Sequence, residues 1–352
     1  MTRRKESFVG LLTGLFGLAA VCIALWALDT QGMINNYVRG IIVQCFYTII
    51  LVTSLNLATG FLGQIALGHA GFMAIGAYTS ALVTKAMGNA IKAGTMAPID
   101  PLIQFAIGLV CGALMAAVFG LIVGIPALRL RGDYLAIITL GFGEIIRVVI
   151  QNLKFAGGRG LAQGQAGQAL IGIMKMNDMY VIFWVAALCV GLMFAFVRSK
   201  FGRAIMAIRE DDIAAGSVGV NNTFYKVLTF AVSAMFAGVA GVVFAHRGLG
   251  TISHNDFSFL KSTEFVIMVV LGGMGSLTGS VIAAITLSIV PELLRAFANY
   301  RMLVYSVMLV IVMIFRPIGL CGNYEFSLFR ILRKGYLAFF PNRKPPAVKG
   351  GE

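Results

Sequence analysis

Long apolar runs follow one another along almost the whole chain. A membrane-spanning helix needs about 20 consecutive apolar residues. Runs that approach or exceed this length cover Phe8–Leu28, Gly40–Thr84, Pro101–Leu128, Tyr134–Asn152, Met179–Val197, Val227–Ala245 and Phe265–Val290. A shorter run, Met302–Phe315, is flanked by Arg301 and Arg316, whose long side chains can reach the membrane interfaces. The pattern predicts an all-α, polytopic transmembrane helix bundle of about 8–10 spans.

Two of these runs are expected to be interrupted. Gly40–Thr84 contains no Lys, Arg, Asp or Glu over 45 residues, which is enough for two crossings with a turn near Thr59-Gly60. Phe265–Val290 carries the sequence Gly272-Gly273-Met274-Gly275 near its centre. Backbone can leave the helix at membrane depth where it is buried in protein or lines a cavity. We therefore expect broken or re-entrant glycine-rich segments, and Phe265–Val290 either crosses twice or re-enters.

The composition agrees with a membrane protein. Of 352 residues, 59% are hydrophobic and 12% charged, whereas about 25% of a typical soluble domain is charged. The low charged fraction excludes an ordinary soluble enzyme. The high hydrophobic fraction excludes a disordered chain, because such chains are poor in hydrophobic residues. The five cysteines and three histidines show no metal-ligand spacing, so no metal site is expected.

The formal net charge of +14 is explained by topology. Cytoplasmic loops of membrane proteins are enriched in Lys and Arg. Placing the N-terminus in the cytoplasm puts the basic loop near 198–226 on that side, and two crossings by Phe265–Val290 bring the C-terminus there too. We therefore expect a transmembrane domain over 1–322 and a basic cytoplasmic tail over 323–352, with an amphipathic helix at about 326–340 on the membrane surface. The expected partner of this charge is the lipid bilayer and not nucleic acid.

Glycines punctuate the segment 59–78, where they occur at 60, 63, 68, 71 and 76. Small residues at such positions allow close helix packing, and they also allow a helix to break beside a substrate path. Both interpretations remain open. Gln64 and His69 are polar candidates on this path, although His69 is more simply a hydrogen-bonded structural residue.

Glu144 and Arg147 are charged residues within an apolar run. They are three positions apart, so they share one helix face and can pair. If the helix begins near Asp133, Glu144 lies about 16 Å along it, near the middle of the bilayer. Such a pair marks either a water-filled interior or a structural lock between helices, and the sequence favours neither.

A polar segment at about 203–219 separates two spans. Ile205, Ile208, Asp212 and Ala215 recur at helical spacing, and Gly219 is placed to end the helix. A helix that is apolar on one side and charged on the other can insert into a groove on a partner protein. The alternative is a solvated connecting loop.

Four motifs in order resemble the membrane subunits of bacterial branched-chain amino acid ABC importers. They are Gly63–Phe72 (GQIALGHAGF), Arg129–Arg147 (RLRGDYLAIITLGFGEIIR), Ala207–Ala215 (AIREDDIAA) and Met268–Ser276 (MVVLGGMGS). The resemblance extends from about Asn56 to Arg316. It implies a permease domain over 1–322 in the bacterial cytoplasmic (inner) membrane.

The resemblance also implies the partners. They are a second homologous permease subunit, two cytoplasmic ATPase subunits that bind ATP and Mg²⁺, and an external substrate-binding protein. The segment 203–219 then resembles the coupling helix that docks on an ATPase, with candidate coupling residues Arg203, Ile208, Arg209, Glu210, Asp211, Asp212, Ala214, Ala215 and Gly219. Candidate residues of the translocation path, or polar residues within the membrane, are Gln64, His69, Glu144, Arg147, Gly272, Gly273 and Gly275.

The chain itself offers little for catalysis. It has no GxxxxGK[ST] phosphate-binding motif, so we expect a transport subunit without cofactor or catalytic residues. Two alternatives remain: a permease for another small polar solute, such as urea or a short amide, and a stand-alone channel or facilitator. The segment 203–219 favours the importer, because a solitary channel needs no docking helix.

Overall fold

The structure, a computed structural model, describes residues 35–294 apart from 96, 98, 129, 131, 154–169, 177 and 249, together with Cys22 and isolated positions between 304 and 319. The helices below all belong to one compact unit, Asn35–Tyr324. The expected first span at Phe8–Leu28, except Cys22, and the tail 323–352, with its helix at 326–340, lie outside the described residues. Met302–Phe315 is described at isolated positions only.

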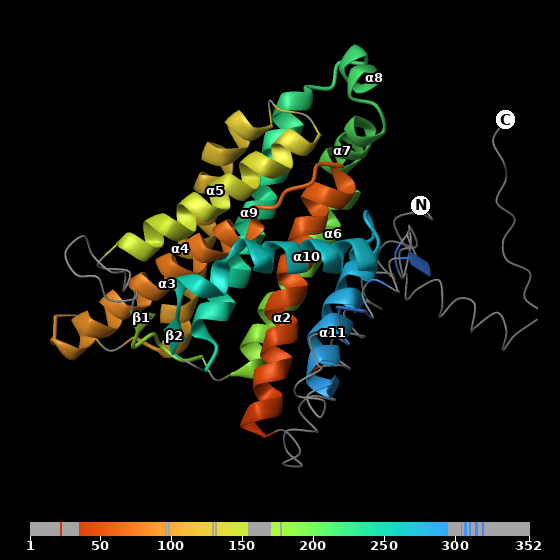
Figure 1. Ribbon diagram of the computed structural model, residues 1–352. Coiled ribbons are helices and arrows are strands. Elements are labelled where there is room, and N and C mark those ends of the chain that lie inside the picture. Colours follow the sequence, from red (N-terminus) through yellow and green to blue (C-terminus); the bar gives the residue numbers. More distant parts are fainter. Residues whose placement is uncertain are drawn as a thin grey trace, which may run out of the picture. The chain divides into compact units, whose positions relative to one another are not determined.

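Helices account for nearly all of the described chain (Figure 1). The α-helices are α2 (Asn36–Asn56), α3 (His69–Lys92), α4 (Pro101–Ala127), α5 (Asp133–Asn152), α6 (Met179–Arg198), α7 (Lys200–Glu210), α8 (Asp212–Ser217), α9 (Asn222–His246), α10 (Phe259–Gly272) and α11 (Leu277–Leu293). The short elements are the π-helix η1 (Leu57–Phe61), the 3-10 helix η3 (His254–Phe257), and the strands β1 (Leu170–Ile171) and β2 (Thr251–Ile252), which pair antiparallel. The predicted all-α fold is confirmed.

Five helical stretches are long and apolar enough to cross a membrane: α2 with η1, α4, α5, α6 and α9. Their bounds follow the apolar runs of the sequence closely, since α6 begins at Met179 and α4 at Pro101. The proline suits the first turn of α4, where its missing N–H is not needed for the helix ladder. The chain is therefore a multi-pass membrane protein.

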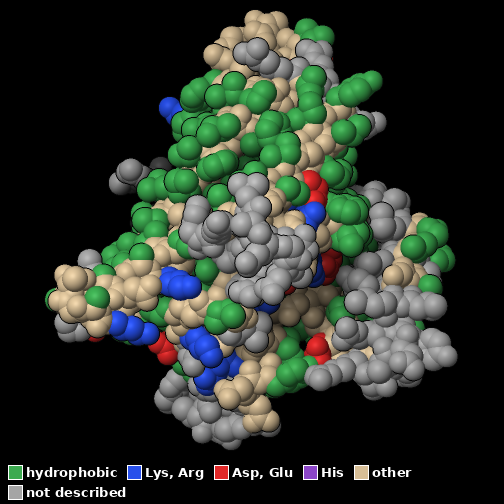
Figure 2. Space-filling model, turned by 60° about the vertical axis from the view of Figure 1, so that its left-hand side comes forward, with side chains coloured by type: hydrophobic (Ala, Val, Ile, Leu, Met, Phe, Trp, Pro, Cys, Tyr) green, Lys and Arg blue, Asp and Glu red, His purple; other side chains and the backbone are tan. Residues whose placement is uncertain are grey.

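The helices divide into central and peripheral ones. In the apolar stretches of α2–η1 and of α9, 78% of the residues are buried, against 33% in α4 and in α6 and 17% in α5. Figure 2 shows an extended hydrophobic surface on the side of α4 and α5, with Lys and Arg gathered below it. Exposed apolar side chains on these helices are expected of faces turned toward lipid.

Glycines bring α3, α4 and α9 into backbone contact. A Cβ atom added at Gly76 in α3 would overlap the backbone of Gly238 in α9. One added at Gly112 in α4 would lie 2.9 Å from the carbonyl oxygen of Gly76. Here glycine serves close helix packing, the first of the two roles considered for the segment 59–78.

The first break in this segment lies a few residues later than expected near Thr59-Gly60. The π-helix η1 continues α2 through both of these residues, and helical structure resumes only at His69. The chain turns at Gly63, whose φ of +75° favours glycine. The segment thus contains both a broken helix, at 62–68, and packing glycines beyond it.

The second break separates α10 from α11. Gly273 and Gly275 have φ values of 108° and 89° and form the turn after α10. Ser276 then caps α11 by accepting a hydrogen bond from the Gly279 N–H. Phe265–Val290 is accordingly a broken segment of two helices, and in Figure 1 α10 runs crosswise to α2 and α11.

Candidate functional site

The first break is closed by hydroxyl groups from two other helices. The backbone N–H of Leu67 donates to Thr139 Oγ1 in α5 at 3.1 Å, and that of Ala70 donates to Ser262 Oγ in α10 at 2.9 Å. Gly68 lies directly against the backbone of Thr139, so that no side chain fits there. Leu62, Ala66 and Gly68 of this non-helical segment are buried, whereas Gly63 and Ile65 are exposed, so the break is only partly enclosed by the bundle.

His69 and Gln64 occupy different positions relative to this break. His69 is the first residue of α3 and only 1% exposed, and its Nε2 shares a hydrogen bond of 2.9 Å with the Ser54 hydroxyl of α2. Gln64 is half-buried, and its backbone N–H donates to the Ala58 carbonyl at 3.0 Å. The structure thus places His69 as a link between α2 and α3.

Asn56 connects the end of α2 to the second break. This fully buried residue donates from Nδ2 to the Ser276 carbonyl at 2.9 Å and to Ser280 Oγ at 2.7 Å. Its Oδ1 accepts the Gly275 N–H at 3.0 Å. The end of α2 is thereby tied to the α10–α11 turn. Sequence reasoning missed Asn56, although an amide within a charge-free run beside a glycine break is a usable signal.

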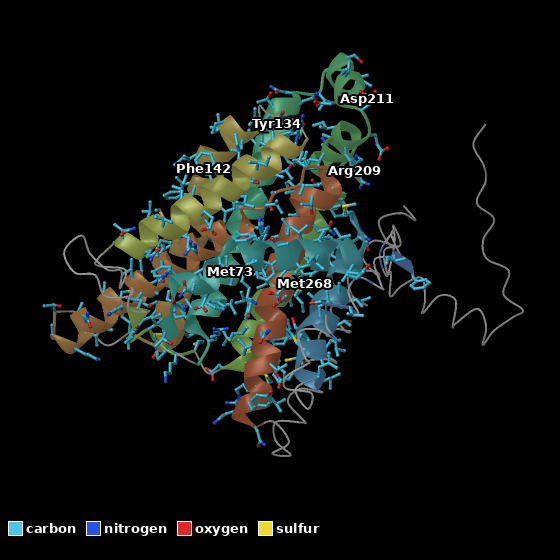
Figure 3. All side chains as sticks on the ribbon, viewed as in Figure 1. Met73, Tyr134, Phe142, Arg209, Asp211 and Met268 are labelled. Atoms are coloured by element: carbon cyan, nitrogen blue, oxygen red, sulfur yellow. The ribbon has the colours of Figure 1, made fainter. Side chains whose placement is uncertain are left out.

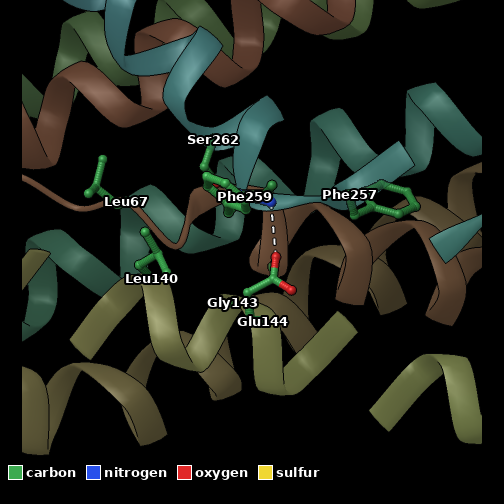
Figure 4. Close-up of a pocket in the computed structure, with 9 residues that line it drawn as sticks. Leu67, Leu140, Gly143, Glu144, Phe257, Phe259 and Ser262 are labelled. Atoms are coloured by element: carbon green, nitrogen blue, oxygen red, sulfur yellow. Dashed lines mark hydrogen bonds between the residues drawn. The ribbon is translucent and has the colours of Figure 1, made fainter. Parts of the chain in front are cut away.

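Glu144 joins α5 to the start of α10. Its Oε2 accepts a hydrogen bond from Arg147 Nε at 2.7 Å, and its Oε1 accepts the backbone N–H of Phe259 at 2.9 Å (Figure 4). A carboxylate at a helix N-terminus also interacts favourably with the helix dipole. About a quarter of each side chain of the pair is exposed. The geometry is that of a lock between helices that remains partly open to its surroundings.

A small hollow, too narrow to hold a water molecule, lies beside Glu144 (Figure 4). It is lined by Leu67, Ala70, Gly71, Leu140, Gly143, Glu144, Phe257, Phe259 and Ser262. A second ion pair follows in the first turns of α10, where Lys261 Nζ lies 2.7 Å from Glu264 Oε2. Both of its side chains are at least a third exposed. Sequence reasoning missed this pair, because it lies just before the apolar run at Phe265.

The polar segment at 203–219 forms two helices where one was expected. Ser199 caps α7 by accepting hydrogen bonds from two backbone N–H groups of its first turn, and the Asp211 carboxylate does the same for α8. Asp211 itself is extended, and this breaks the helix. Gly219 follows α8 and has a φ of +86°. It ends the hairpin, as predicted from its position in the sequence. We call residues 200–219 the α7–α8 hairpin.

Several residues of the α7–α8 hairpin face inward. Ile205, Ile208 and Ala215 are 1%, 4% and 4% exposed and pack against the bundle. The apolar face predicted from helical spacing is thus used to hold the hairpin on its own chain. Asp212 adds a polar anchor, since it pairs with Lys226 of α9 at 2.8 Å.

The opposite side of the hairpin faces outward. Ile213 and Val218 are each 79% exposed, and Met206 is 37% exposed. Arg203, Glu210, Ala214 and Gly219 are exposed around them. The hairpin projects from the end of the bundle in Figure 1, at the end where α6 finishes and α9 begins.

Arg209 differs from its charged neighbours in the hairpin. In Figure 3, Arg209 lies nearer the long helices of the bundle, whereas Asp211 lies further out. Its Nη1 donates a hydrogen bond of 2.7 Å to the Gly60 carbonyl at the end of η1. Gly275 of the second break lies beside the same guanidinium group.

The structure therefore distributes the candidate residues over four places. Gln64 and His69 lie at the first break. Glu144 and Arg147 lie on α5 at the start of α10, whereas Gly272, Gly273 and Gly275 lie at the second break. The candidate coupling residues lie in the α7–α8 hairpin, some outward and some inward. Within the described residues, no three His, Cys, Asp or Glu side chains are grouped to hold a metal ion.

Comparison with known proteins assigns the family. Residues 37–314 match the model of the branched-chain amino acid transport system / permease component family. The high-affinity branched-chain amino acid transport system permease protein LivM of Escherichia coli (strain K12) is 36% identical over 330 residues, which cover 86% of this chain and 74% of LivM. LivH of Salmonella typhimurium (strain LT2) is 26% identical over 82% of this chain and 94% of its own length. BraD of Pseudomonas aeruginosa is 25% identical over 83% of this chain and 96% of its own length.

The search of solved structures found no match for this chain. The family match covers every described helix of the fold except the first residue of α2. It also includes both breaks and the α7–α8 hairpin. The chain belongs to the permease components of branched-chain amino acid transport systems.

Proposed function

We propose that this permease imports branched-chain amino acids, or amino acids close to them, across the bacterial inner membrane with energy from separate ATPase subunits. The names of LivM, LivH and BraD support this substrate class. ATP and Mg²⁺ would bind to the ATPases and not to this chain. A second related permease and an external substrate-binding protein complete the proposed assembly.

The exposed face of the α7–α8 hairpin is the observation that carries the proposal. Large apolar side chains in a polar segment outside the membrane are costly to leave in water, and grouped ones mark protein interaction sites. Ile213 and Val218 satisfy this description, each at 79% exposure. The inward residues Ile205 and Ala215 fix the hairpin to the bundle, so force applied to its outer face would reach the membrane helices.

The orientation follows from this docking. ATPases act in the cytoplasm, so the α7–α8 hairpin and the adjoining ends of α6 and α9 would be cytoplasmic. The N- and C-termini would lie on the same side by the positive-inside rule. β1 and β2, at the other ends of α6 and α9, would then face outward, toward the substrate-binding protein.

The translocation path is proposed to run along α5 and the first half of α10. Two ion pairs, Glu144–Arg147 and Lys261–Glu264, lie there with side chains at least partly exposed. Charges are costly against lipid and typically face a water-filled cavity or protein within the membrane. Each pair carries no net charge and apolar residues surround them, which suits a zwitterion with an aliphatic side chain.

Replacing Ile213 by aspartate tests the docking face. We expect the variant to insert and fold normally, with stability changed by no more than about 0.5 kcal/mol because the side chain is exposed. ATPase co-purification should fall at least about tenfold, the loss expected when a central apolar contact is replaced by a charge. The measurement is the ratio of ATPase to permease after affinity purification of the tagged permease.

The matched control for this test is Ile171→Asp. Ile171 is 63% exposed, and it lies in β1 before α6 whereas the hairpin follows α6. The same substitution is thus made at the opposite end of a helix of 20 residues, about 30 Å away. Normal co-purification of ATPase with Ile213→Asp would mean that the hairpin is only a solvated connection.

The Glu144–Arg147 pair gives a second prediction. Glu144→Gln keeps an acceptor for the Phe259 N–H but removes the partner charge of Arg147, so we expect a loss of roughly 1–3 kcal/mol, between exposed and fully buried pairs. The double variant Glu144→Gln/Arg147→Gln should recover part of this loss. Thermal unfolding of the purified protein in detergent measures both, and strictly additive losses would contradict an interaction.

A further inference from the structure

Arg209 places one guanidinium group between the two breaks. Its Nη1 lies 2.7 Å from the Gly60 carbonyl oxygen. A Cβ atom added at Gly275 would lie 2.8 Å from the same Nη1, and one added at Gly63 would lie 3.1 Å from Arg209 Cγ. The side chain of Arg209 therefore passes over Gly63 and ends between Gly60 and Gly275, although Arg209 belongs to an exposed hairpin.

The group that Arg209 binds is the unpaired end of a helix. The last carbonyls of a helix have no partner within it, and Gly60 is the penultimate residue of η1. A charged donor makes a stronger hydrogen bond to such a carbonyl than a neutral one. Arg209 thus holds the end of α2–η1 at the point where the chain leaves the helix for the segment 62–68.

Glycines on both sides leave room for this side chain. Gly63 and Gly275 both have positive φ, so each turn requires glycine for its backbone conformation as well as for space. Asn56, at the end of α2, accepts the Gly275 N–H within the bundle, and a Cβ atom added at Gly60 would overlap the same Gly275 nitrogen. The two breaks therefore form one unit, with Asn56 on its inner side and Arg209 on its outer side.

The other end of the connection is firmly held on α7. Ile205 and Ile208 are buried beside Arg209 in this helix. Gly202 lies against the backbone of Val197 in α6 with no room for a Cβ. A displacement of α7 would accordingly carry Arg209 with it, and the Arg209–Gly60 hydrogen bond would transmit it to the broken segments.

We propose that Arg209 is a positioning residue that couples movement of the α7–α8 hairpin to the two helix breaks. It contacts neither the ATPase nor the substrate in this role. The inference rests on the proposed docking of an ATPase on the hairpin, and it assigns the step after docking: movement of α7 shifts Gly60 and Gly275 together, and with them the segments that border α5 and α10.

The test measures transport per ATP hydrolysed. The complete transporter, with its partner permease, ATPases and binding protein from the same organism, is reconstituted in proteoliposomes with radiolabelled leucine as the probe. Arg209→Met keeps the apolar stem over Gly63 but removes the hydrogen bond to Gly60. We expect normal ATPase co-purification and an at least tenfold fall in leucine taken up per ATP hydrolysed.

Two further variants sharpen the test. Lys200→Met removes a positive charge from the same helix at an exposed position and should leave uptake per ATP unchanged. Arg209→Lys keeps a cationic donor without the planar guanidinium and should give uptake per ATP between those of Arg209→Met and the unmodified protein. This intermediate result is not expected for a residue that only fills space, because Met fills it equally well.

The outcomes separate this inference from the proposed function. Unchanged uptake per ATP in Arg209→Met would overturn the coupling role. Loss of ATPase co-purification in Arg209→Met would also overturn it, since Arg209 would then act in docking. If Arg209→Met assembles poorly, Arg209→Lys decides the question. Leucine uptake per ATP in Arg209→Lys that equals that of the unmodified protein would overturn the inference. Failure of the proposed function is seen separately, as normal ATPase binding by Ile213→Asp.

Discussion

Replacing Gly76 by valine is expected to prevent the helix bundle from forming. A Cβ atom at Gly76 would lie 2.5 Å from the Gly238 Cα and would overlap its carbonyl group, so that α3 and α9 must separate. Overpacking of side chains costs about 1–3 kcal/mol, and we expect more here because two backbones are in contact and neither can change rotamer. The measurement is the yield of monodisperse permease in detergent and its thermal unfolding temperature.

Gly191→Val is the matched control for this experiment. Gly191 is also in the middle of an apolar helix, α6, but a Cβ atom there would meet no atom within 4 Å. We expect a stability change of less than about 1 kcal/mol, the range of helix propensities. Equal stability of the two variants would show that α3 and α9 are not held as closely as the structure has them.

Replacing Asn56 by leucine should disconnect the end of α2 from the second helix break. The change preserves volume approximately, but it leaves the partly buried Gly275 N–H without its acceptor and removes two buried donated hydrogen bonds. An unsatisfied buried group costs about 1–3 kcal/mol and each lost hydrogen bond about 1 kcal/mol. We therefore expect a clear fall in thermal stability and loss of uptake.

Asn89→Leu serves as the control for Asn56→Leu. Asn89 is exposed near the end of α3, so the same substitution should change stability by no more than about 0.5 kcal/mol. Hydrogen exchange of the backbone amides at 273–276 gives a local readout. Exchange at 273–276 that is as slow in Asn56→Leu as in the unmodified protein would contradict the link between α2 and the second break.

The spans of this protein could be predicted because the membrane leaves few choices. A helix in lipid satisfies all of its backbone groups internally, so an apolar run of sufficient length determines the element. α6 begins at Met179 as its run predicted. The breaks were predictable for a related reason, since glycine clusters such as Gly272-Gly273 remove the side chains that packing and helix formation use.

The contacts between distant elements could not be predicted in this way. Asn56 and Ser280 are 224 positions apart, and no local pattern reports such a pairing. The same limit applies to Arg209, which helical spacing places in a docking segment but whose side chain turns back to Gly60. Ala215 shows the converse, because the resemblance placed it among the residues that couple to an ATPase, whereas it is buried in its own chain.

Leucine uptake into proteoliposomes tests the importer assignment most directly. The permease is reconstituted either alone or with its second permease, ATPases and leucine-loaded binding protein from the same organism, with Mg²⁺ and ATP on the ATPase side. We predict accumulation of leucine only with the partners and ATP together, and no uptake above empty liposomes for the permease alone. Equal uptake by the permease alone, without ATP, would contradict the account and indicate a facilitator.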